Sequence, residues 1–243
     1  MSLITNLLVT FYSLMTSTSA IECAPQNTPE IRLEANGVVM EPDMFLNVLD
    51  EAFPLRTRRF HLLGQEIAAR PLRRYHPQIR LQTWLVFERC AQENLPAEVC
   101  IAIPLVESKW TSWARNDASD TIKYCGMFQR SARYSYTRDE RIRLTAGGDF
   151  TAQQMDDRCQ EIIDSADLQV SMFIQYLNWM RQFEGSPINN ACRYKTGYEA
   201  CASNHPYSVR ARQLLELVTA SYAREQRRIN LDDQPLYCSA PAH

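Results

Sequence analysis

The chain has 243 residues, of which 45% are apolar and 22% are charged, with a formal net charge of −2. This length allows one sizeable core but not several independent domains. Because a near-neutral chain has no general attraction to phosphate backbones or anionic lipid, we expect no nucleic-acid partner.

Residues 1–20 form the first predicted element, a secretory signal peptide. The segment has no charged side chain, carries an apolar stretch from Leu3 to Met15, and ends in small residues suited to cleavage near Ala20. It lacks an early Lys or Arg, so an uncleaved membrane anchor is the alternative, although Thr, Ser and Asn dilute its hydrophobicity. The segment predicts export, to the periplasm or cell envelope.

The chain contains 8 cysteines, all of which follow this segment. An even number of cysteines behind an export signal predicts disulfide bonds. Two pairs are named as guesses: Cys192 with Cys201, closing a short loop, and Cys23 with Cys238, joining the two ends. The sequence has no CxxC pair and no two histidines at helical spacing, so we expect no metal site.

The next segments are an N-terminal arm at residues 21–55, a helical domain at 56–222 and a polar C-terminal tail at 223–243. Prolines punctuate the arm, which we expect to contain at most one short helix, near Asp43–Ala52, and to pack as an addition to the domain.

Helical spacing of apolar residues dominates the domain. Helices are predicted over about 79–94, 96–107, 167–184, 186–194 and 207–227. The charged segment 138–165 predicts a surface excursion with a short helix near Cys159. Since no run of residues alternates as a half-buried strand does, the expected fold class is all-α (mainly α).

The stretch LPAEVCIAIPLVESKW, residues 95–110, predicts an apolar helix that ends on an acid, Glu107. An apolar wall raises the pKa of a carboxyl group because it disfavours the charged form. A glycosidic oxygen is a poor leaving group until it is protonated, so an acid that keeps its proton near neutral pH suits general-acid chemistry on sugars. The alternative is an ordinary solvated glutamate at a helix end.

Several blocks occur in a recognisable order over about residues 95–220. They are the lead-in LPAEV, VESKW at 106–110, GMFQ at 126–129, the helix Asp167–Met180, and Tyr194-Lys195-Thr196-Gly197 followed by Tyr207. The ordered set resembles the soluble lytic transglycosylase domain of the lysozyme-like superfamily, and the lead-in most resembles the type-D membrane-bound lytic murein transglycosylases. The resemblance implies a lysozyme-like helical transglycosylase domain, here stapled by disulfides, with its catalytic core at 95–220.

The resemblance also implies an activity: cleavage of the MurNAc-GlcNAc β-1,4 bond of peptidoglycan with formation of 1,6-anhydro-MurNAc. Glu107 would act first as acid and then as base, so no second carboxylate and no cofactor would be needed. The substrate-binding residues implied are Ser108, Asn116, Met127, Phe128, Gln129, Tyr194 and Tyr207. The expected partners are peptidoglycan glycan strands, with unidentified proteins of an envelope-spanning machine as further candidates.

Departures from the family pattern leave alternatives open. Asp117 and Asp120 lie in a loop that is longer than in the family, and either could be the second carboxylate of a lysozyme-like muramidase. Lys195 stands where the family often has Asn, and a cation near the acid would oppose general-acid work. Lys195 and the long loop together suggest a non-catalytic peptidoglycan-binding component. For Met127 and Phe128, core packing is the alternative.

Overall fold

A computed structural model of the chain describes residues 31–55, 58–62, 65–69, 72–146, 148–197, 202 and 204–232. The predicted cleavage near Ala20 and the predicted pair Cys23–Cys238 lie outside these residues, and so does Cys201 of the predicted pair Cys192–Cys201. The boundaries proposed for the arm, the domain and the tail stay predictions.

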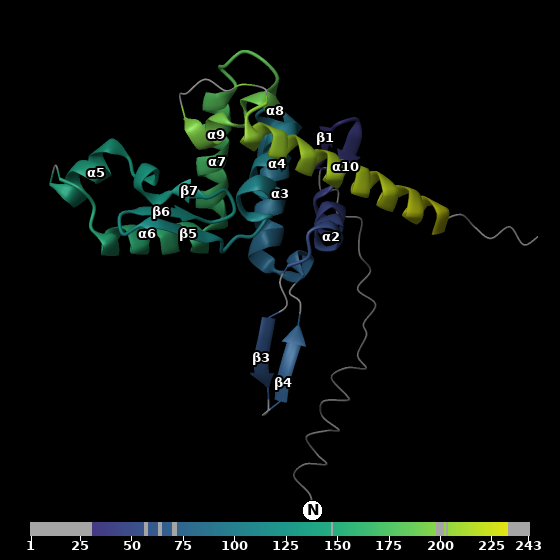
Figure 1. Ribbon diagram of the computed structural model, residues 1–243, viewed down its shortest axis with the longest axis horizontal. Helices are drawn as coiled ribbons and strands as arrows, with labels where there is room; N and C mark the ends of the chain where they lie inside the picture. The colour runs from purple at the N-terminus through teal and green to yellow at the C-terminus, as the bar shows by residue number, and fades with distance from the viewer. Residues whose placement is uncertain are drawn as a thin grey trace, which may run out of the picture. The chain divides into compact units, whose positions relative to one another are not determined.

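Helices dominate the described residues, which confirms the mainly α class (Figure 1). They are α2 (Pro42–Ala52), α3 (Pro77–Gln92), α4 (Ala97–Ser108), α5 (Arg138–Thr145), α6 (Ala152–Asp164), α7 (Ala166–Met180), α8 (Pro187–Asn190), α9 (Arg193–Thr196) and α10 (Pro206–Asp232), with short 3₁₀ turns at Arg73–Tyr75 and Ala132–Ser135. The helix expected over 186–194 is thus two short helices, and α7 ends before Gly185.

The described residues also contain small antiparallel sheets, so the expectation of no strands was wrong. The strands are β1 (Leu33–Ala35) paired with β2 (Val38–Met40), β3 (Arg58–Leu62) paired with β4 (Gln65–Ala69), and the sheet β5 (Arg115–Ser119), β6 (Ile122–Cys125), β7 (Arg130–Ser131). Strands of two to five residues are too short for an alternating pattern to stand out in a sequence.

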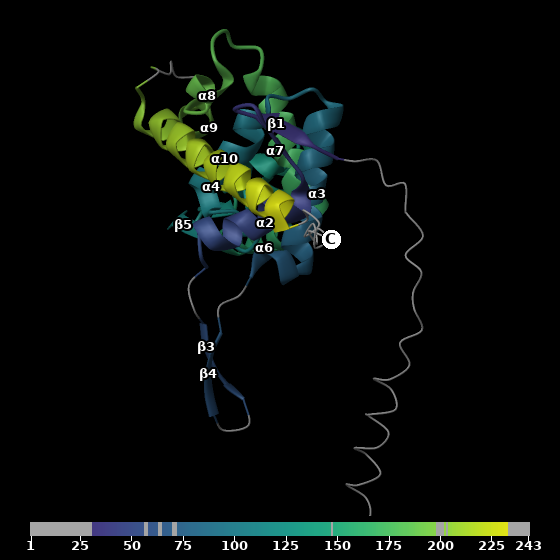
Figure 2. The same cartoon turned by 90° about the vertical axis from the view of Figure 1, so that its right-hand side faces the viewer.

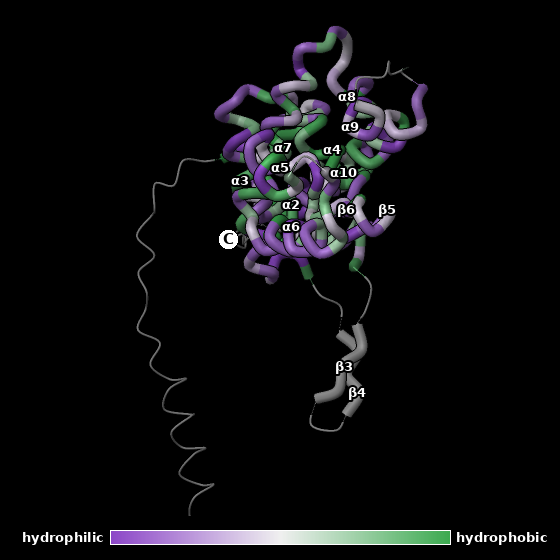
Figure 3. Tube along the Cα trace, turned by 90° about the vertical axis from the view of Figure 1, so that its left-hand side faces the viewer, coloured by the Kyte–Doolittle hydropathy of each residue, from purple (hydrophilic) through white to green (hydrophobic). Residues whose placement is uncertain are grey.

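One large cluster of buried apolar side chains joins α2, α3, α4, α7 and α10. Every residue of α4 from Ala97 to Leu105 except Glu98 is buried, so this helix is enclosed on all sides. The long α10 packs across α4 and α2, while α3 packs against α7 (Figure 2). The hydrophobic stretches of α4 and α7 lie inward of more hydrophilic loops (Figure 3).

The segment expected to be an added arm contributes to this core. The helix predicted near 43–52 is confirmed as α2, and its Phe45, Leu46 and Leu49 side chains are fully buried. The Phe45 ring lies 5.3 Å from the ring of Phe87 and 4.7 Å from that of Trp110, centroid to centroid. The helix is therefore part of the main core.

A second, smaller cluster of buried side chains joins the three-stranded sheet to α6. It contains Phe150, Met155 and Ile162 together with the cysteines of β6 and α6. The segment predicted as a surface excursion therefore divides into α5, none of whose residues is buried, and α6, which covers this cluster.

Two disulfide bonds between described residues hold neighbouring elements together. Cys90–Cys100 joins the end of α3 to the start of α4, and Cys125–Cys159 joins β6 to α6. The prediction of disulfides is thus confirmed, and such bonds indicate an oxidising, extracytosolic environment. Among the helices in the described ranges, none is long and apolar enough to cross a membrane.

Candidate active site

A cavity of about 650 Å³ lies against α4, the three-stranded sheet, α7 and α9. Its volume is in the range of small-molecule and sugar sites, and its wall is both polar and aromatic. Among its described lining residues, Glu107 is the only acid. These residues are Glu107, Asn116, Tyr124, Gln129, Arg130, Ser131, Tyr134, Met172, Gln175, Tyr176, Trp179, Tyr194, Lys195, Thr196 and Gly197.

Glu107 lies in the last turn of the enclosed helix α4, and its side chain is partly buried. Burial raises the pKa of its carboxyl group and is the largest influence on it. A hydrogen bond from Tyr207 and the charges of Lys195, Arg130 and Lys109 act in the opposite direction. The net pKa of Glu107 is raised, so the effect of burial exceeds that of the cations. These include Lys195, which the sequence analysis expected to oppose general-acid chemistry.

Two tyrosines lie beside this carboxyl group. Tyr207, at the start of α10, donates its hydroxyl to Oε1 of Glu107 at 2.6 Å. Tyr194, on α9, lines the cavity and donates to the backbone oxygen of Phe128 at 2.7 Å. Burial raises the pKa of both hydroxyls, so both tyrosines remain neutral donors. The structure therefore brings both predicted tyrosines to the acid.

Asn116 and Gln129, two of the residues expected to bind substrate, also line the cavity. Asn116 is exposed on β5, opposite Tyr124 on β6. Gln129 has a left-handed φ of 47°, and its Nε2 donates to the backbone oxygens of Ala114 at 2.9 Å and Gly126 at 3.0 Å. Gln129 thus stabilises the turn before β7 as well as lining the cavity.

Four predicted substrate-binding residues are not among the described lining: Tyr207, which bonds to the acid, and Ser108, Met127 and Phe128. The Met127 and Phe128 side chains are buried in the core, and the Phe128 ring stacks on Phe173 at 4.2 Å. The expected contact of these two side chains with a sugar ring is therefore corrected to core packing. Ser108 accepts a hydrogen bond from the backbone N–H of Thr111 at 3.0 Å, as a hydroxyl at a helix end does.

Asp117 and Asp120 do not line the cavity either. Asp117 pairs with Arg115 at 2.7 Å and with Lys123 at 3.7 Å, and the hydrogen bond from Arg115 lowers the pKa of its carboxyl group. Lys123 and Arg115 also pair with Asp156 of α6, so these charges tie the sheet to that helix. Asp120 is exposed in the turn between β5 and β6.

Much of the cavity wall was missed by the sequence analysis. Arg130 of β7 places its guanidinium 4.1 Å from the ring centroid of Tyr176 on α7. On the same helix, Met172, Gln175 and Trp179 also line the cavity. Gln175, Tyr176 and Trp179 follow Met172 by three, four and seven residues, the spacing of one helix face. This second stripe, beside the stripe that faces the core, was the signal that the sequence offered.

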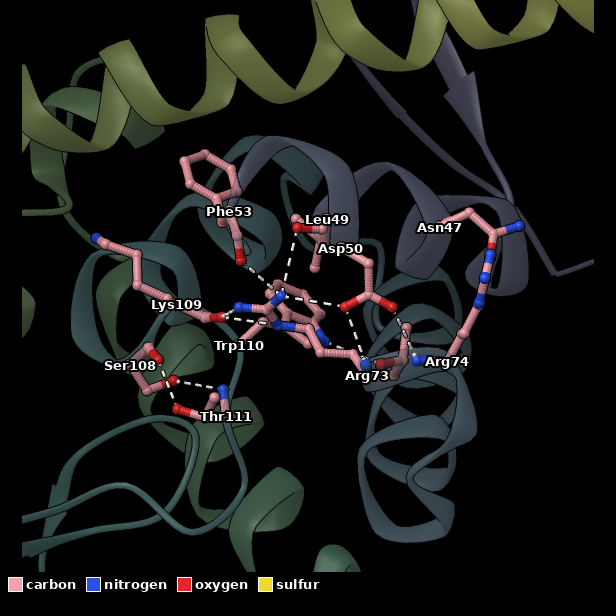
Figure 4. A network of polar contacts seen from close by, with 11 residues as sticks. Asn47, Leu49, Asp50, Phe53, Arg73, Arg74, Ser108, Lys109, Trp110 and Thr111 are labelled. Carbon is pink, nitrogen blue, oxygen red and sulfur yellow. Dashed lines mark hydrogen bonds and ion pairs between the residues drawn. The ribbon is translucent and has the colours of Figure 1, made fainter. Parts of the chain in front are cut away.

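The backbone behind the acid is held by a buried arginine (Figure 4). The chain leaves α4 through Lys109 and Trp110, which both have left-handed φ values, 56° and 64°. Arg73 donates to the backbone oxygen of Lys109 from Nε at 3.1 Å and from Nη2 at 2.7 Å, and its Nη1 pairs with Asp50 at 3.3 Å. This network fixes the end of the helix that carries Glu107.

Comparisons with known proteins give no match: the chain matches no protein-family model, no curated protein and no solved structure. Within the described ranges, no group of three or more His, Cys, Asp or Glu side chains could hold a metal ion. The described lining of the cavity provides one acid, two cations, tyrosines and amides.

Proposed function

We propose that the protein is a peptidoglycan lytic transglycosylase in which Glu107 is the only acid and base. One observation carries the proposal: a carboxyl group with a raised pKa stands at the end of an apolar helix, in a cavity whose described lining holds no other acid. A carboxyl group that is still protonated can donate to the glycosidic oxygen as the bond to C1 breaks.

In the second half of this reaction the carboxylate of Glu107 accepts a proton from the 6-hydroxyl of the same MurNAc unit. The oxygen of that hydroxyl bonds to C1, which closes the 1,6-anhydro ring, and the acid is regenerated. A hydrolase would instead need a carboxylate to activate water. The engagement of Asp117 with Arg115, and the absence of both Asp117 and Asp120 from the described lining, favour the reaction without water.

The remaining wall residues suit a glycan. Tyr176 and Trp179 offer aromatic faces to sugar rings, while Asn116 and Gln129 carry amides for acetamido and hydroxyl groups. We propose a lysozyme-like arrangement for this helical domain, and a location in the periplasm or cell envelope, where its substrate lies. Disulfide bonds are consistent with such a location.

Digestion of isolated peptidoglycan sacculi, followed by mass spectrometry, tests the proposal. The wild type should release muropeptides that end in 1,6-anhydro-MurNAc. Glu107→Gln should reduce release roughly 100- to 10,000-fold, because an amide has no proton to transfer. Asp117→Asn and Asp120→Asn, the matched carboxylate-to-amide controls, should keep the activity and the anhydro product.

Each other result has a definite meaning. Near-normal release by Glu107→Gln would overturn the assignment of the acid. If the wild type releases products with a reducing MurNAc end, and Asp117→Asn or Asp120→Asn abolishes this release, the protein is a muramidase. Binding to sacculi without any released product would indicate a non-catalytic peptidoglycan-binding component.

A further inference from the structure

Two cations line the cavity beside Glu107, Arg130 from β7 and Lys195 from α9. Within the described part of the chain, neither forms an ion pair with a carboxylate. By contrast, Arg115 of β5 and Lys123 of β6, in the same sheet as Arg130, are both paired with Asp117. The cavity therefore carries more positive than negative charge in its described lining.

Arg130 is held in place by aromatic rings. Its guanidinium lies 4.1 Å from the ring centroid of Tyr176 and 5.4 Å from that of Tyr194. Hydroxyl groups anchor both rings, because Tyr176 donates to the backbone oxygen of Arg193 at 2.6 Å and Tyr194 donates to that of Phe128. The cation is thus positioned before any ligand arrives, which lowers the entropy lost on binding.

One atom of Arg130 is incompletely satisfied. Its Nε is buried and has no hydrogen-bond partner among the described residues. A buried donor of this kind is unfavourable unless an acceptor reaches it, and such exceptions call for an explanation. An anionic oxygen bound in the cavity would supply one.

Lys195 adds a second positive charge from another wall. Its side chain is exposed, and Nζ lies 5.7 Å from the ring centroid of Tyr124 on β6. Both Lys195 and Arg130 act electrostatically on the carboxyl group of Glu107. The two cations therefore share one cavity with the acid and influence its charge.

We propose that Arg130 and Lys195 together bind a carboxylate of the muramic acid unit next to the cleaved bond. This inference rests on the proposed function. Muramic acid carries a lactyl group whose carboxyl is free when no peptide is attached and is an amide when one is. The free lactyl carboxylate is the nearest source to the sugar ring, and an acidic group of an attached peptide is the other.

A bound carboxylate would also support the acid chemistry. Lys195, Arg130 and Lys109 lower the pKa of Glu107, as does the hydrogen bond from Tyr207, while burial raises it. An anion paired with Arg130 and Lys195 would offset their effect, because opposite charges screen one another. The proton would then be held most firmly on Glu107 when an anionic substrate occupies the cavity.

Isothermal titration calorimetry on the Glu107→Gln chain, which is expected not to cleave its ligand, measures this recognition. The ligands are three GlcNAc-MurNAc tetrasaccharides: one with free lactyl carboxylates, one with these carboxyls converted to methylamides, and one that bears peptides. The free acid should bind about ten- to a hundredfold more tightly than the methylamide, because the methylamide cannot form charge-assisted hydrogen bonds.

Arg130→Gln and Lys195→Gln, each added to this background, should bring the ratio of those two dissociation constants towards one. Arg133→Gln is the matched control, since Arg133 pairs with Asp149 at 2.7 Å and does not line the cavity, and the ratio should persist. Because Lys195 is exposed, its variant tests the inference even where Arg130→Gln does not fold.

The possible results separate the two proposals. If the peptide-bearing ligand binds most tightly and loses this advantage in both variants, the bound carboxylate belongs to the peptide. Equal binding of all three ligands would overturn the inference while leaving anhydro-product release by the wild type as support for the transglycosylase. If the free acid binds more tightly than the methylamide but the wild type releases no anhydro product, the transglycosylase proposal is overturned and the proposed anion site is supported.

Discussion

The backbone oxygen of Lys109 accepts two hydrogen bonds from the fully buried guanidinium of Arg73. Arg73 also donates from Nη1 to the backbone oxygens of Leu49 at 3.3 Å and Phe53 at 2.8 Å. One side chain thus connects the end of α2 to the turn that follows Glu107. The position of the acid depends on a residue that does not line the cavity.

Replacing Arg73 with Met should lower the free energy of unfolding by roughly 3–5 kcal/mol, because buried Asp50 would lose a cationic partner. The double variant Arg73→Met with Asp50→Leu should recover part of this loss, since both charges are then removed. Urea unfolding of the two variants measures the difference. A loss below about 1 kcal/mol in the single variant would contradict a structural role for this pair.

Tyr207→Phe should shift the pH dependence of cleavage to higher pH. The hydrogen bond from Tyr207 lowers the pKa of Glu107, whereas burial raises it. Removing the hydrogen bond should therefore raise the pKa of Glu107 further. A general acid must be protonated, and activity is lost as pH rises through its pKa. The alkaline limb of kcat/KM should therefore move upward, and an unchanged or lowered limb would contradict this account.

The matched control for that measurement is Tyr222→Phe. Tyr222 is also buried on α10, where its hydroxyl accepts a hydrogen bond from the backbone N–H of Glu41 at 2.8 Å. It lies about 22 Å further along the helix, from the rise of 1.5 Å per residue. Its loss should lower stability modestly and leave the alkaline limb in place.

Gly126→Ala should destabilise the turn that leads to Gln129. Gly126 has a φ of +76°, and an added Cβ would overlap the side chain of Gln169. That side chain accepts the backbone N–H of Met127 at 2.6 Å, so it cannot move without losing a buried hydrogen bond. The two effects together should cost about 2–5 kcal/mol of unfolding free energy.

Gly37→Ala separates the two contributions. Gly37 has a similar φ of +72° but nothing within 4 Å of an added Cβ. Only the backbone strain should then be felt, about 1–2 kcal/mol. Equal losses for the two alanine variants in urea unfolding would mean that the close approach of Gln169 is unimportant.

Features that depend on neighbours along the chain could be predicted from the order of residues. The apolar helix α4, whose last turn carries Glu107, follows from an apolar run after Pro96, and α7 follows from helical spacing. These patterns are local, because a helix bonds each residue to one four positions away. The presence of disulfides could be predicted from the cysteine count, but the bonds Cys90–Cys100 and Cys125–Cys159 could not, since pairing depends on distance in space.

The balance of charges around the acid could be found only in the folded chain. Glu107, Arg130 and Lys195 are far apart in sequence, and the packing of α4, β7 and α9 brings them to one cavity. Packing likewise commits Asp117 to Arg115 and buries Met127 and Phe128. The pKa of a side chain depends on its burial and on nearby charges. Both are set by the tertiary structure, so the order of residues alone does not reveal them.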